Sequence, residues 1–553
     1  MKFLYMKNLL LFLLTIVLLS CNSESNQPDV VFNKYDETVA LEEQQNHENP
    51  RMKFKLFQSK VLDMNEVFKP FNAALSTFSE EEYQSLKPLI IEQNIPTIQG
   101  YVKEGKLSYE KLTLFYLYRI RKFESDSTKS LNAIITLNPN VLEEAKQRDK
   151  DRKWGILSDV EIYGMPILLK DNINTEGMPT TAGALALLNN KNTEDAFIVK
   201  KLKENGALIL GKANLSEWAY YFCSGCPLGY SAIGGQSLNP YGRAKFETGG
   251  SSASSGTAVA ANYAVAAVGT ETAGSITSPS SQNSVVGLKP TIGLLSRTGI
   301  VPISGTLDTP GPMTKSVTDS WIFLNAMLGE DNKDPKSFEM PDKDFGDMED
   351  GFKGKRIGVL TYLFQDSIYN SNVNKIKEAG VTIVEVNPPR VGLPGFLTLL
   401  NIDMKYDLPH YLKSDADKNV TVTSVKDVID FNIKDSILRA PYGQQLFEGI
   451  VKDTTSKKQL ESIKVTLKEN GRSYFNALKE ENLDAILSIN NYHSAYSAVA
   501  EYPNLTVPMG YKESGEPVSL TFVGLPKTEG KLLILGYAFE QLTKVRKLPE
   551  NYQ

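Results

Sequence analysis

The chain has 553 residues, of which 41% are hydrophobic and 23% are charged, and this is ordinary usage for a globular protein. Its net charge of −5 gives no reason to expect nucleic-acid binding, which usually needs a basic patch. The length alone favours several domains, and no stretch beyond the N-terminal segment is long and apolar enough to predict a transmembrane helix.

The first element is a short apolar segment, residues 9–19, which follows Lys2 and Lys7. Its length is typical of a secretory signal peptide and is too short to span a bilayer comfortably. It ends in Leu-Leu-Ser-Cys, which resembles the cleavage box of bacterial lipoproteins. We therefore predict a signal peptide over residues 1–20, export, and a lipid on Cys21 that anchors the protein to a bacterial membrane, facing the periplasm or the cell surface. A non-lipidated secretory signal or a simple N-terminal anchor is the alternative.

Residues 22–49 are polar and contain many Asn, Glu, Gln and Ser residues. This composition is typical of a tether between a membrane and a folded domain. We expect the tether and an N-terminal extension to occupy residues 21–80, and a catalytic domain to occupy residues 81–553.

Residues 165–169 form an apolar run that ends at Lys170. The run is too brief for a helix and predicts a short buried strand. A lysine in such a place is paired, neutral or both, because an unpaired buried charge is costly. If it is paired, Lys170 is a structural salt-bridge residue. If it is neutral, burial has lowered its pKa and it can act as a base.

The next elements alternate between helix and strand. Apolar residues recur at helical spacing within residues 195–204, and Gly206 ends this predicted helix. Residues 207–210 predict the strand that follows. Asn214 and Glu217 are spaced as a capping pair at the start of another helix.

Cys223 and Cys226 are the only cysteines besides Cys21. A zinc site would need two further ligands, and the sequence has neither a second Cys-x-x-Cys pair nor paired histidines. We therefore predict no metal and no cofactor, and a thioredoxin-like redox role has no other support. In an exported protein the pair forms either a small loop disulfide or two unlinked thiols, and we assign it no catalytic part.

Two stretches rich in glycine and serine follow, at residues 249–256 and 269–275. Such a composition usually indicates a flexible loop. Here, however, residues 257–261 predict a helix of small residues, and residues 264–268 predict a buried strand. A disordered linker would not be framed by such apolar segments.

Ser251 and Ser275 lie in these two stretches, and together with the lysine described above they form a candidate catalytic set. A serine hydroxyl is a weak nucleophile and needs a base, which a neutral lysine can supply without any histidine. The chain has only three histidines, His47, His410 and His493. None lies in a stretch that looks like a Ser-His-Asp site.

The last third of the chain is less informative. Residues 329–484 are richer in Lys, Asp and Glu and predict a helical peripheral region that shapes the substrate cleft. Near the C-terminus, Leu532, Leu535, Phe539 and Leu542 lie on one face of a predicted helix, which we expect to pack on the core.

Further motifs extend along most of the chain after its first hundred residues. They are residues 98–105, 131–138, 206–218, 286–291, 299–304, 308–313, 501–508 and 536–541. With the two serine-bearing stretches, they resemble the amidase signature family. The likeness is weaker between Gly329 and Asp484. Within the family the chain looks most like bacterial peptide amidases, which also carry Gly-Thr-Glu-Thr before the nucleophile.

The resemblance implies one α/β catalytic domain with the amidase signature fold, a mixed β-sheet core covered by helices on both faces. It also implies the catalytic roles. Ser275 is the nucleophile, and Ser251 is the bridging serine, which the family holds with a cis peptide bond. Lys170 is the base that draws a proton from Ser275 through Ser251.

The oxyanion hole implied by the resemblance consists of the backbone amides of Thr272, Ala273 and Gly274. Many family members have two glycines before the nucleophile, where this chain has Ala273 and Gly274. Many have a glycine-containing triplet where this chain has residues 253–255, and many have an arginine where it has Thr277. None of these changes removes a catalytic atom. The missing arginine leaves the charge preference for the substrate open.

The activity implied is a serine amidohydrolase that cleaves carboxylic amides, such as peptide C-terminal amides or similar acyl amides, through an acyl-enzyme on Ser275. Its expected partners are a small-molecule or peptide amide and, through the lipid, a membrane. One alternative is an inactive surface-anchored binding protein on an amidase scaffold, against which the complete catalytic set argues. Another is the amidase component of a tRNA-dependent amidotransferase, which would work in the cytoplasm beside partner subunits, so the export signal argues against it.

Overall fold

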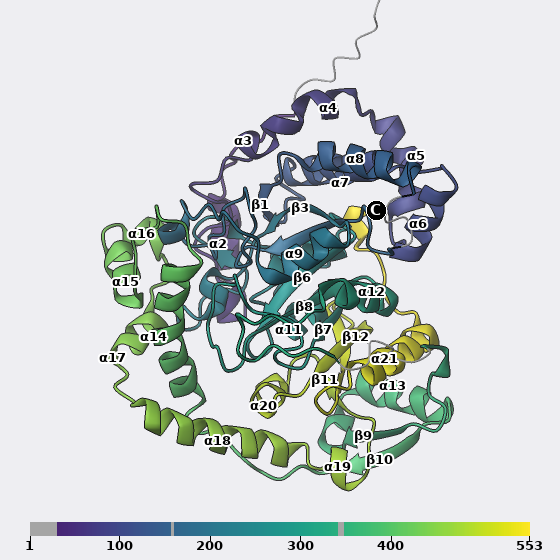
Figure 1. Ribbon diagram of the computed structural model, residues 1–553, viewed down its shortest axis with the longest axis vertical. Coiled ribbons are helices and arrows are strands. Elements are labelled where there is room, and N and C mark those ends of the chain that lie inside the picture. The colour runs from purple at the N-terminus through teal and green to yellow at the C-terminus, as the bar shows by residue number, and fades with distance from the viewer. Residues whose placement is uncertain (1–29, 156–159, 341–347) are drawn as a thin grey trace, which may run out of the picture.

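The computed structural model describes residues 30–155, 160–340 and 348–553. The predicted signal peptide, Cys21 and the first part of the predicted tether lie outside these residues. Figure 1 shows strands through the centre of the molecule, with the N-terminal helices above them and a long run of helices along the left and lower edges.

Among the described residues, the core is one eleven-stranded sheet with the order β1-β3-β2-β6-β8-β7-β12-β13-β11-β9-β10. Its strands are β1 (Ile134–Leu137), β2 (Pro166–Lys170), β3 (Leu208–Ala213), β6 (Ala266–Glu271), β7 (Val286–Lys289), β8 (Thr309–Thr314), β9 (Arg356–Leu360), β10 (Thr382–Val386), β11 (Ala485–Ile489), β12 (Asn504–Tyr511) and β13 (Pro517–Val523). A separate hairpin contains β4 (Tyr230–Ser231) and β5 (Gly235–Gln236). Strand β2 is parallel to β3 and β6, whereas β8 is antiparallel to β6 and β7, so the sheet is mixed, as the family resemblance implies.

Strand β2 positions the candidate lysine. All five of its residues are buried, which confirms the buried strand predicted from the apolar run. Its register pairs Leu169 with Val268 on β6. Because parallel strands direct their carboxyl ends to the same edge of a sheet, Lys170 lies beside the loop that follows Glu271.

Helices cover both faces of the sheet. One layer contains α9 (Phe197–Glu204), α12 (Val317–Met327) and α21 (Glu529–Thr543), and the other contains α10 (Ala253–Ala260) and α11 (Thr277–Gln282). Helices α10 and α11 consist mainly of small, buried residues and lie close to the sheet. A Cβ on Gly287 of β7 would lie only 2.1 Å from the Ser280 hydroxyl of α11. This close packing fixes the segments that carry the two candidate serines.

The N-terminal extension packs against the catalytic domain. Its helices are α2 (Thr38–Gln44), α3 (Met64–Phe68) and α4 (Asn72–Thr77), and α5 (Glu80–Ile90), α6 (Ile95–Lys103), α7 (Tyr109–Glu124) and α8 (Val141–Lys153) follow them. Gln44 is buried and donates to the carbonyl oxygens of Met52 and Ala244 at 2.6 and 3.0 Å. The tether predicted for residues 22–49 is therefore wrong for the docked helix Thr38–Gln44, and also for Phe32 and Tyr35, whose backbone amides donate to Asn65 and Gln58. Apolar residues that follow this helix hold the extension against the catalytic domain. Met52, Phe54, Phe57, Phe68 and Phe71 are all buried in the main core.

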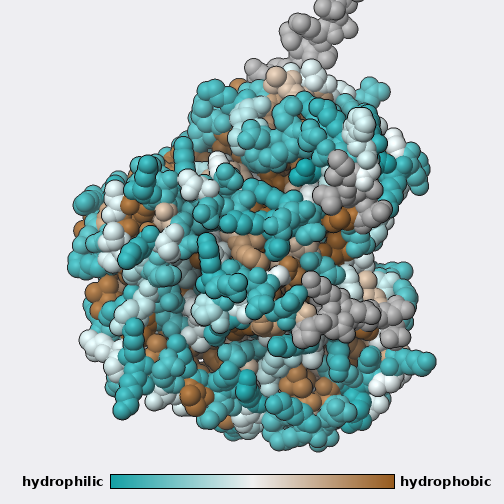
Figure 2. Space-filling view, viewed as in Figure 1, coloured by the Kyte–Doolittle hydropathy of each residue, from teal (hydrophilic) through white to brown (hydrophobic). Residues whose placement is uncertain are grey.

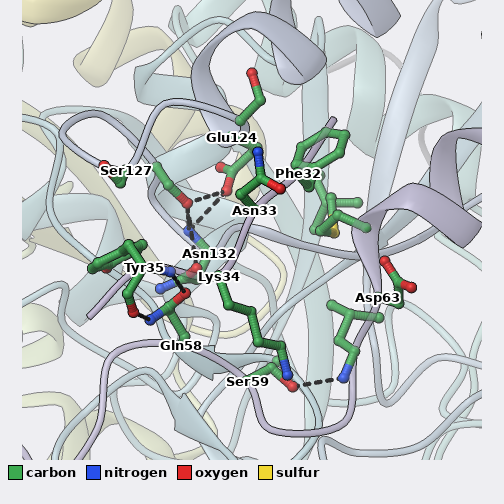
Figure 3. Close-up of a pocket in the computed structure, with 16 residues that line it drawn as sticks. Phe32, Asn33, Lys34, Tyr35, Gln58, Ser59, Asp63, Glu124, Ser127 and Asn132 are labelled. Carbon is green, nitrogen blue, oxygen red and sulfur yellow. Dashed lines mark hydrogen bonds between the residues drawn. The ribbon is translucent and has the colours of Figure 1, made fainter. Parts of the chain in front are cut away.

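A pocket of about 100 Å³ lies where this extension crosses the end of α7 and the start of β1 (Figure 3). Tyr35 and Gln58 exchange hydrogen bonds on one side of it, at 3.1 and 2.7 Å. On the other side, the Glu124 carboxylate accepts from the Ser130 hydroxyl at 2.8 Å and from the backbone N–H of Asn132 at 3.0 Å. None of the predicted site residues lines this pocket.

Residues 329–484 contain both helices and strands. The helices are α13 (Ser367–Glu378), α14 (Phe396–Ser414), α15 (Val425–Ile433), α16 (Ser436–Arg439), α17 (Gln445–Lys452), α18 (Lys457–Tyr474) and α19 (Ala477–Glu480), and α20 (Ser494–Ala500) follows β11. The helical peripheral region predicted here is wrong for β9 and β10, which pair in parallel and extend the sheet. Their Ile, Val and Leu residues favour strands, although the charged composition around them hides this signal.

The predicted cap formed by Asn214 and Glu217 is also wrong. The Asn214 amide donates to the carbonyl oxygens of Asn132 and Gly235 and so ties the end of β3 to two neighbouring segments. Glu217–Tyr220 forms a short 3-10 helix in place of an α-helix. A buried asparagine can donate hydrogen bonds to carbonyl groups that are distant in the sequence, and the local spacing of residues does not reveal such partners.

The last helix packs mostly as expected. Leu532, Leu535 and Phe539 are fully buried, whereas Leu542 is 42% exposed because α21 ends at Thr543. Within the described part of the chain, no helix has both the length and the apolar character needed to cross a membrane. Figure 2 shows a mainly hydrophilic face on which hydrophobic residues form small groups.

Candidate active site

Lys170 is fully buried at the end of β2 and makes three hydrogen bonds. Its Nζ lies 2.7 Å from the Ser251 hydroxyl, 2.9 Å from the Thr270 hydroxyl and 3.2 Å from the Thr270 carbonyl oxygen. All three partners are neutral. Among the described residues, no carboxylate lies within ion-pair distance of Lys170.

The environment of Lys170 favours its neutral form. Burial lowers its pKa to about 7, while the more distant charges of Asp308 and Glu271 act in the opposite direction. An amine with this pKa is about half neutral at pH 7, and it is already in contact with a serine hydroxyl. The salt-bridge interpretation of Lys170 is therefore excluded by the lack of a carboxylate partner among the residues that the structure describes.

Ser251 is fully buried, and its peptide bond to Gly250 is cis. The Ser251 carbonyl oxygen accepts from the Ser216 amide at 3.0 Å. The amide of the next residue, Ser252, donates to the Ser275 carbonyl oxygen at 3.2 Å. The structure thus joins Lys170 to Ser251 through side chains, and it joins the segments that bear Ser251 and Ser275 through the backbone.

Ser275 lies in the turn between β6 and α11 and is partly exposed. The three residues before it are Thr272, Ala273 and Gly274, and Gly274 has a φ of +109°, which favours glycine. Within the described residues, the N–H groups of these three residues donate to no protein acceptor. They are therefore available to a bound oxygen atom beside Ser275.

Glu271 organises this turn, although the sequence analysis assigned it no role. One of its carboxylate oxygens accepts from the backbone amides of Ile276 and Thr277, both at 2.8 Å. The same oxygen accepts from the Thr277 hydroxyl at 2.9 Å. Thr277 therefore donates through both its backbone amide and its hydroxyl to this one oxygen, whereas the other carboxylate oxygen, Oε1, is buried and has no hydrogen-bond partner among the described residues. The preserved Gly-Thr-Glu-Thr stretch was the available signal.

Asp308 is a second carboxylate that the sequence analysis missed as a site residue. It precedes β8 and accepts from the Thr272 hydroxyl at 2.5 Å. Its other oxygen accepts from the amides of Ile303 and Ser304 at 2.8 and 2.9 Å. Burial raises the pKa of Asp308. The residue therefore connects the turn before Ser275 to the loop that precedes β8.

A serine–histidine contact also occurs away from the lysine. The Ser488 hydroxyl lies 2.5 Å from His493 Nδ1, and His493 Nε2 lies 2.7 Å from the Tyr362 hydroxyl. Burial lowers the pKa of His493 to about 4, and its ring stacks on Tyr474. No carboxylate among the described residues contacts this histidine, so the arrangement lacks the acid of a Ser-His-Asp site.

Cys223 and Cys226 form a disulfide, which decides between the two states considered for them. They are buried and follow the 3-10 helix near Ser251. Within the part of the chain that the structure describes, no group of three or more His, Cys, Asp or Glu side chains could hold a metal ion.

The fold and these motifs define a class of protein. The model of the Amidase family matches residues 111–495. The chain belongs to the amidase signature family and is a hydrolase that acts on amides.

Individual relatives agree with this assignment. The chain is 36% identical over 479 residues to a probable amidase of Arabidopsis thaliana, and the match covers 83% of this chain and 92% of that protein. It is 31% identical over 497 residues to a glutamyl-tRNA(Gln) amidotransferase subunit from Thermoanaerobacter pseudethanolicus, with 82% of this chain and 97% of that protein covered.

Solved structures are similar over most of the chain. An amidase family protein from Bacillus anthracis superposes with a TM-score of 0.84 at 40% identity, covering 90% of this chain and all of that one. The peptide amidase from Stenotrophomonas maltophilia superposes with a TM-score of 0.78 at 37% identity, covering 83% of this chain and 99% of that one.

Proposed function

We propose that this amidase is a serine hydrolase in which Lys170, Ser251 and Ser275 act as base, relay and nucleophile. The observation that carries the proposal is the contact of a buried, unpaired Lys170 Nζ with the Ser251 hydroxyl at 2.7 Å. The lowered pKa of Lys170, about 7, supports its role as a proton acceptor.

In the acylation step, Ser275 Oγ attacks the amide carbonyl carbon and loses its proton to Ser251, which passes a proton to Lys170. The resulting tetrahedral intermediate collapses when the leaving nitrogen takes a proton back along the same route, so that ammonia or an amine departs. Water then attacks the acyl-enzyme with the same base, releases the acid and restores Ser275.

The N–H groups of Thr272, Ala273 and Gly274 are proposed to hold the oxyanion of this intermediate. Donors of this kind contribute about 3 kcal/mol each in comparable hydrolases. Their lack of protein acceptors among the described residues supports this role. Glu271 and Asp308 hold the turn from either side and are positioning residues, because they contact the turn and not the reacting atoms.

A fluorophosphonate probe tests the nucleophile directly, since it labels activated serines. We expect labelling of the wild type and none of Ser275→Ala, with Ser488→Ala as a matched control that labels like the wild type. Labelling retained in Ser275→Ala and lost in Ser488→Ala would move the nucleophile to the serine–histidine contact. No labelling of either form would favour an inactive binding protein.

We further propose peptide C-terminal amides or similar acyl amides as substrates. The likeness to the Stenotrophomonas maltophilia peptide amidase supports this class. The test is ammonia release from amidated peptides, free Asn and Gln, aryl amides and fatty amides, with Ser275→Ala as the blank. Release from free Asn or Gln alone would point away from peptide amides.

Export as a lipoprotein remains our proposal for the N-terminus. It predicts that radiolabelled palmitate enters the wild type and is absent from Cys21→Ser. Equal labelling of both would contradict it. An amidotransferase component, favoured by the similarity to the Thermoanaerobacter pseudethanolicus protein, would instead remain in the cytoplasm and co-purify with partner subunits.

A further inference from the structure

A cavity of about 770 Å³ lies between α14, the loop over residues 297–308 and the segment 333–336. Five of its lining residues are spaced along one face of α14: Asp403, Asp407, His410, Tyr411 and Ser414. This helix lies at the left of the sheet in Figure 1. Its polar face thus lines a cavity of the size that holds a small ligand.

The cavity adjoins the turn that bears the proposed nucleophile. Asp308 lines it and accepts from the Thr272 hydroxyl in that turn at 2.5 Å. The amides of residues 303–304 donate to Asp308, and the amide of the next residue, Gly305, donates to Asp407 at 2.6 Å. One short loop therefore connects Asp407 to the turn before Ser275.

Most charges of the cavity already have partners. Three cations are each paired with a carboxylate: Arg297 Nε with Asp334 at 2.6 Å, Lys464 with Asp403 at 3.3 Å, and Lys336 with Glu501 at 3.4 Å. Lys333 and His410 line the cavity with exposed side chains. Across the described ranges, no Lys, Arg or His lies within ion-pair distance of Asp407.

Asp407 is therefore a carboxylate on a cavity wall that accepts a backbone amide but has no ion-pair partner among the described residues. Burial raises its pKa to about 6, with the charges of Asp403 and Asp308 acting in the same direction and the Gly305 amide and the more distant charge of Lys464 acting in the opposite direction. At neutral pH the group is still mostly ionised. A cation that enters the cavity would offset these effects through its charge, since an opposite charge favours the ionised carboxylate.

We propose that Asp407 determines substrate specificity by binding a cationic group, an ammonium or a guanidinium, on the acyl side of the amide. The inference rests on the proposed amide hydrolysis and adds the charge of the preferred substrate. The cation comes either from a Lys or Arg side chain or from a free peptide N-terminus.

Hydrolysis of matched peptide amides tests the proposal. Acetyl-Lys-Leu-amide, acetyl-norleucine-Leu-amide and acetyl-Glu-Leu-amide differ in one charge, and Gly-Leu-amide against acetyl-Gly-Leu-amide tests the free N-terminus. We expect the wild type to favour the cationic member of at least one set by about tenfold in kcat/KM, as for a charged hydrogen bond. The set that shows the preference identifies the source of the cation.

The variants assign the preference to one carboxylate. Asp407→Asn should reduce the cationic-to-neutral ratio to about one, and Asp407→Glu should keep part of it. Asp430→Asn is the matched control, because Asp430 is an exposed acid on α15 that is paired with Lys426, outside the cavity lining. That variant should keep the wild-type ratio. If Asp407→Asn and Asp430→Asn lose the preference equally, the preference depends on the net charge of the protein, and the proposal is overturned.

Binding separates this inference from the proposed function. Calorimetry with Ser275→Ala measures affinity for the same peptides without turnover. Equal affinity for the cationic and neutral members, together with equal kcat/KM in the wild type, would overturn the role of Asp407. If no amide is hydrolysed but the cationic peptide still binds about tenfold more tightly, the cation subsite stands and the proposed function fails.

Discussion

The neighbouring strands β2 and β3 each bury a lysine, and the two lysines are held in different ways. Lys170 contacts only the hydroxyl and carbonyl groups of Ser251 and Thr270. Lys212 donates to the Ile173 carbonyl oxygen and to the Thr180 hydroxyl, and it also lies 3.9 Å from an Asp171 carboxylate oxygen. Both residues are fully buried.

The difference lies in the partners and not in burial. Burial lowers both values, the pKa of Lys170 to about 7 and that of Lys212 to about 8. The Asp171 charge raises the pKa of Lys212 and so favours its charged form. This pair holds the loop after β2 in place. Lys170 contacts the Ser251 hydroxyl in place of a carboxylate such as Asp171, so no negative charge within ion-pair distance, among the described residues, holds its amine in the protonated form. One buried lysine stabilises the fold, and the other is available for chemistry.

The largest expected effect is on turnover in Lys170→Met. The substitution keeps the length of the side chain and removes the base, and a positioned general base contributes about 10²–10⁴-fold. We expect kcat to fall by about this factor while circular dichroism and the unfolding midpoint remain those of a folded protein. Turnover close to the wild-type value would assign the base to another group.

Lys212→Met should act on stability. It leaves the Asp171 carboxylate buried without its cation, and breaking a buried pair costs about 3–5 kcal/mol. Urea unfolding measures this loss, with Lys170→Met as the matched comparison. If the two variants lose the same stability, the distinction between the two lysines is wrong.

Glu271→Gln tests the turn that faces Lys170. The glutamine side chain keeps the shape of glutamate but is uncharged, so the hydrogen bonds that it accepts from the backbone N–H groups of Ile276 and Thr277 are weaker. Hydrogen bonds to a charged group contribute about 1.5–3 kcal/mol. We expect kcat/KM to fall about 10–100-fold. Because the Glu271 charge raises the pKa of Lys170, the midpoint of the pH–rate profile should also move down. Thr277→Val, which removes only one donor, should have the smaller effect.

The pH dependence of stability gives the most gradual signal. The pKa of Lys170 is about 7 in the folded chain and about 10.4 when unfolded, so the unfolded state binds more protons between these values. This residue therefore makes stability rise with pH in that window, by up to about 1.4 kcal/mol per pH unit. We expect the wild type to gain stability relative to Lys170→Met between pH 7 and pH 9. A constant difference would mean that Lys170 is charged in the folded state.

Much of the fold could be predicted from the sequence because its signals are local. The apolar run before Lys170 became β2, residues 195–204 correspond to α9, and residues 264–268 overlap β6. The family motifs along the chain predicted that these elements belong to one α/β domain. What the sequence missed depends on distant partners. Gln44 is held by Met52 and Ala244, and no pattern near it distinguishes a docked helix from a tether.

In the candidate site, too, residues within local motifs could be predicted and residues that depend on distant partners could not. Lys170, Ser251 and Ser275 could be predicted as candidates because short motifs surround them. Glu271 lies in one of those motifs but received no role, since its hydrogen bonds to residues 276–277 depend on the turn. Asp407 had no signal at all, because its position beside the cavity depends on how α14 packs against the loop before β8.

The most direct test of the account is the pH dependence of Ser275 inactivation by a fluorophosphonate, which needs no knowledge of the substrate. We predict that the rate in the wild type rises with a midpoint near pH 7, the pKa of Lys170, and that Lys170→Met reacts slowly with no step near that pH. A midpoint near the ordinary lysine value of about 10.4, or an unchanged step in Lys170→Met, would contradict it.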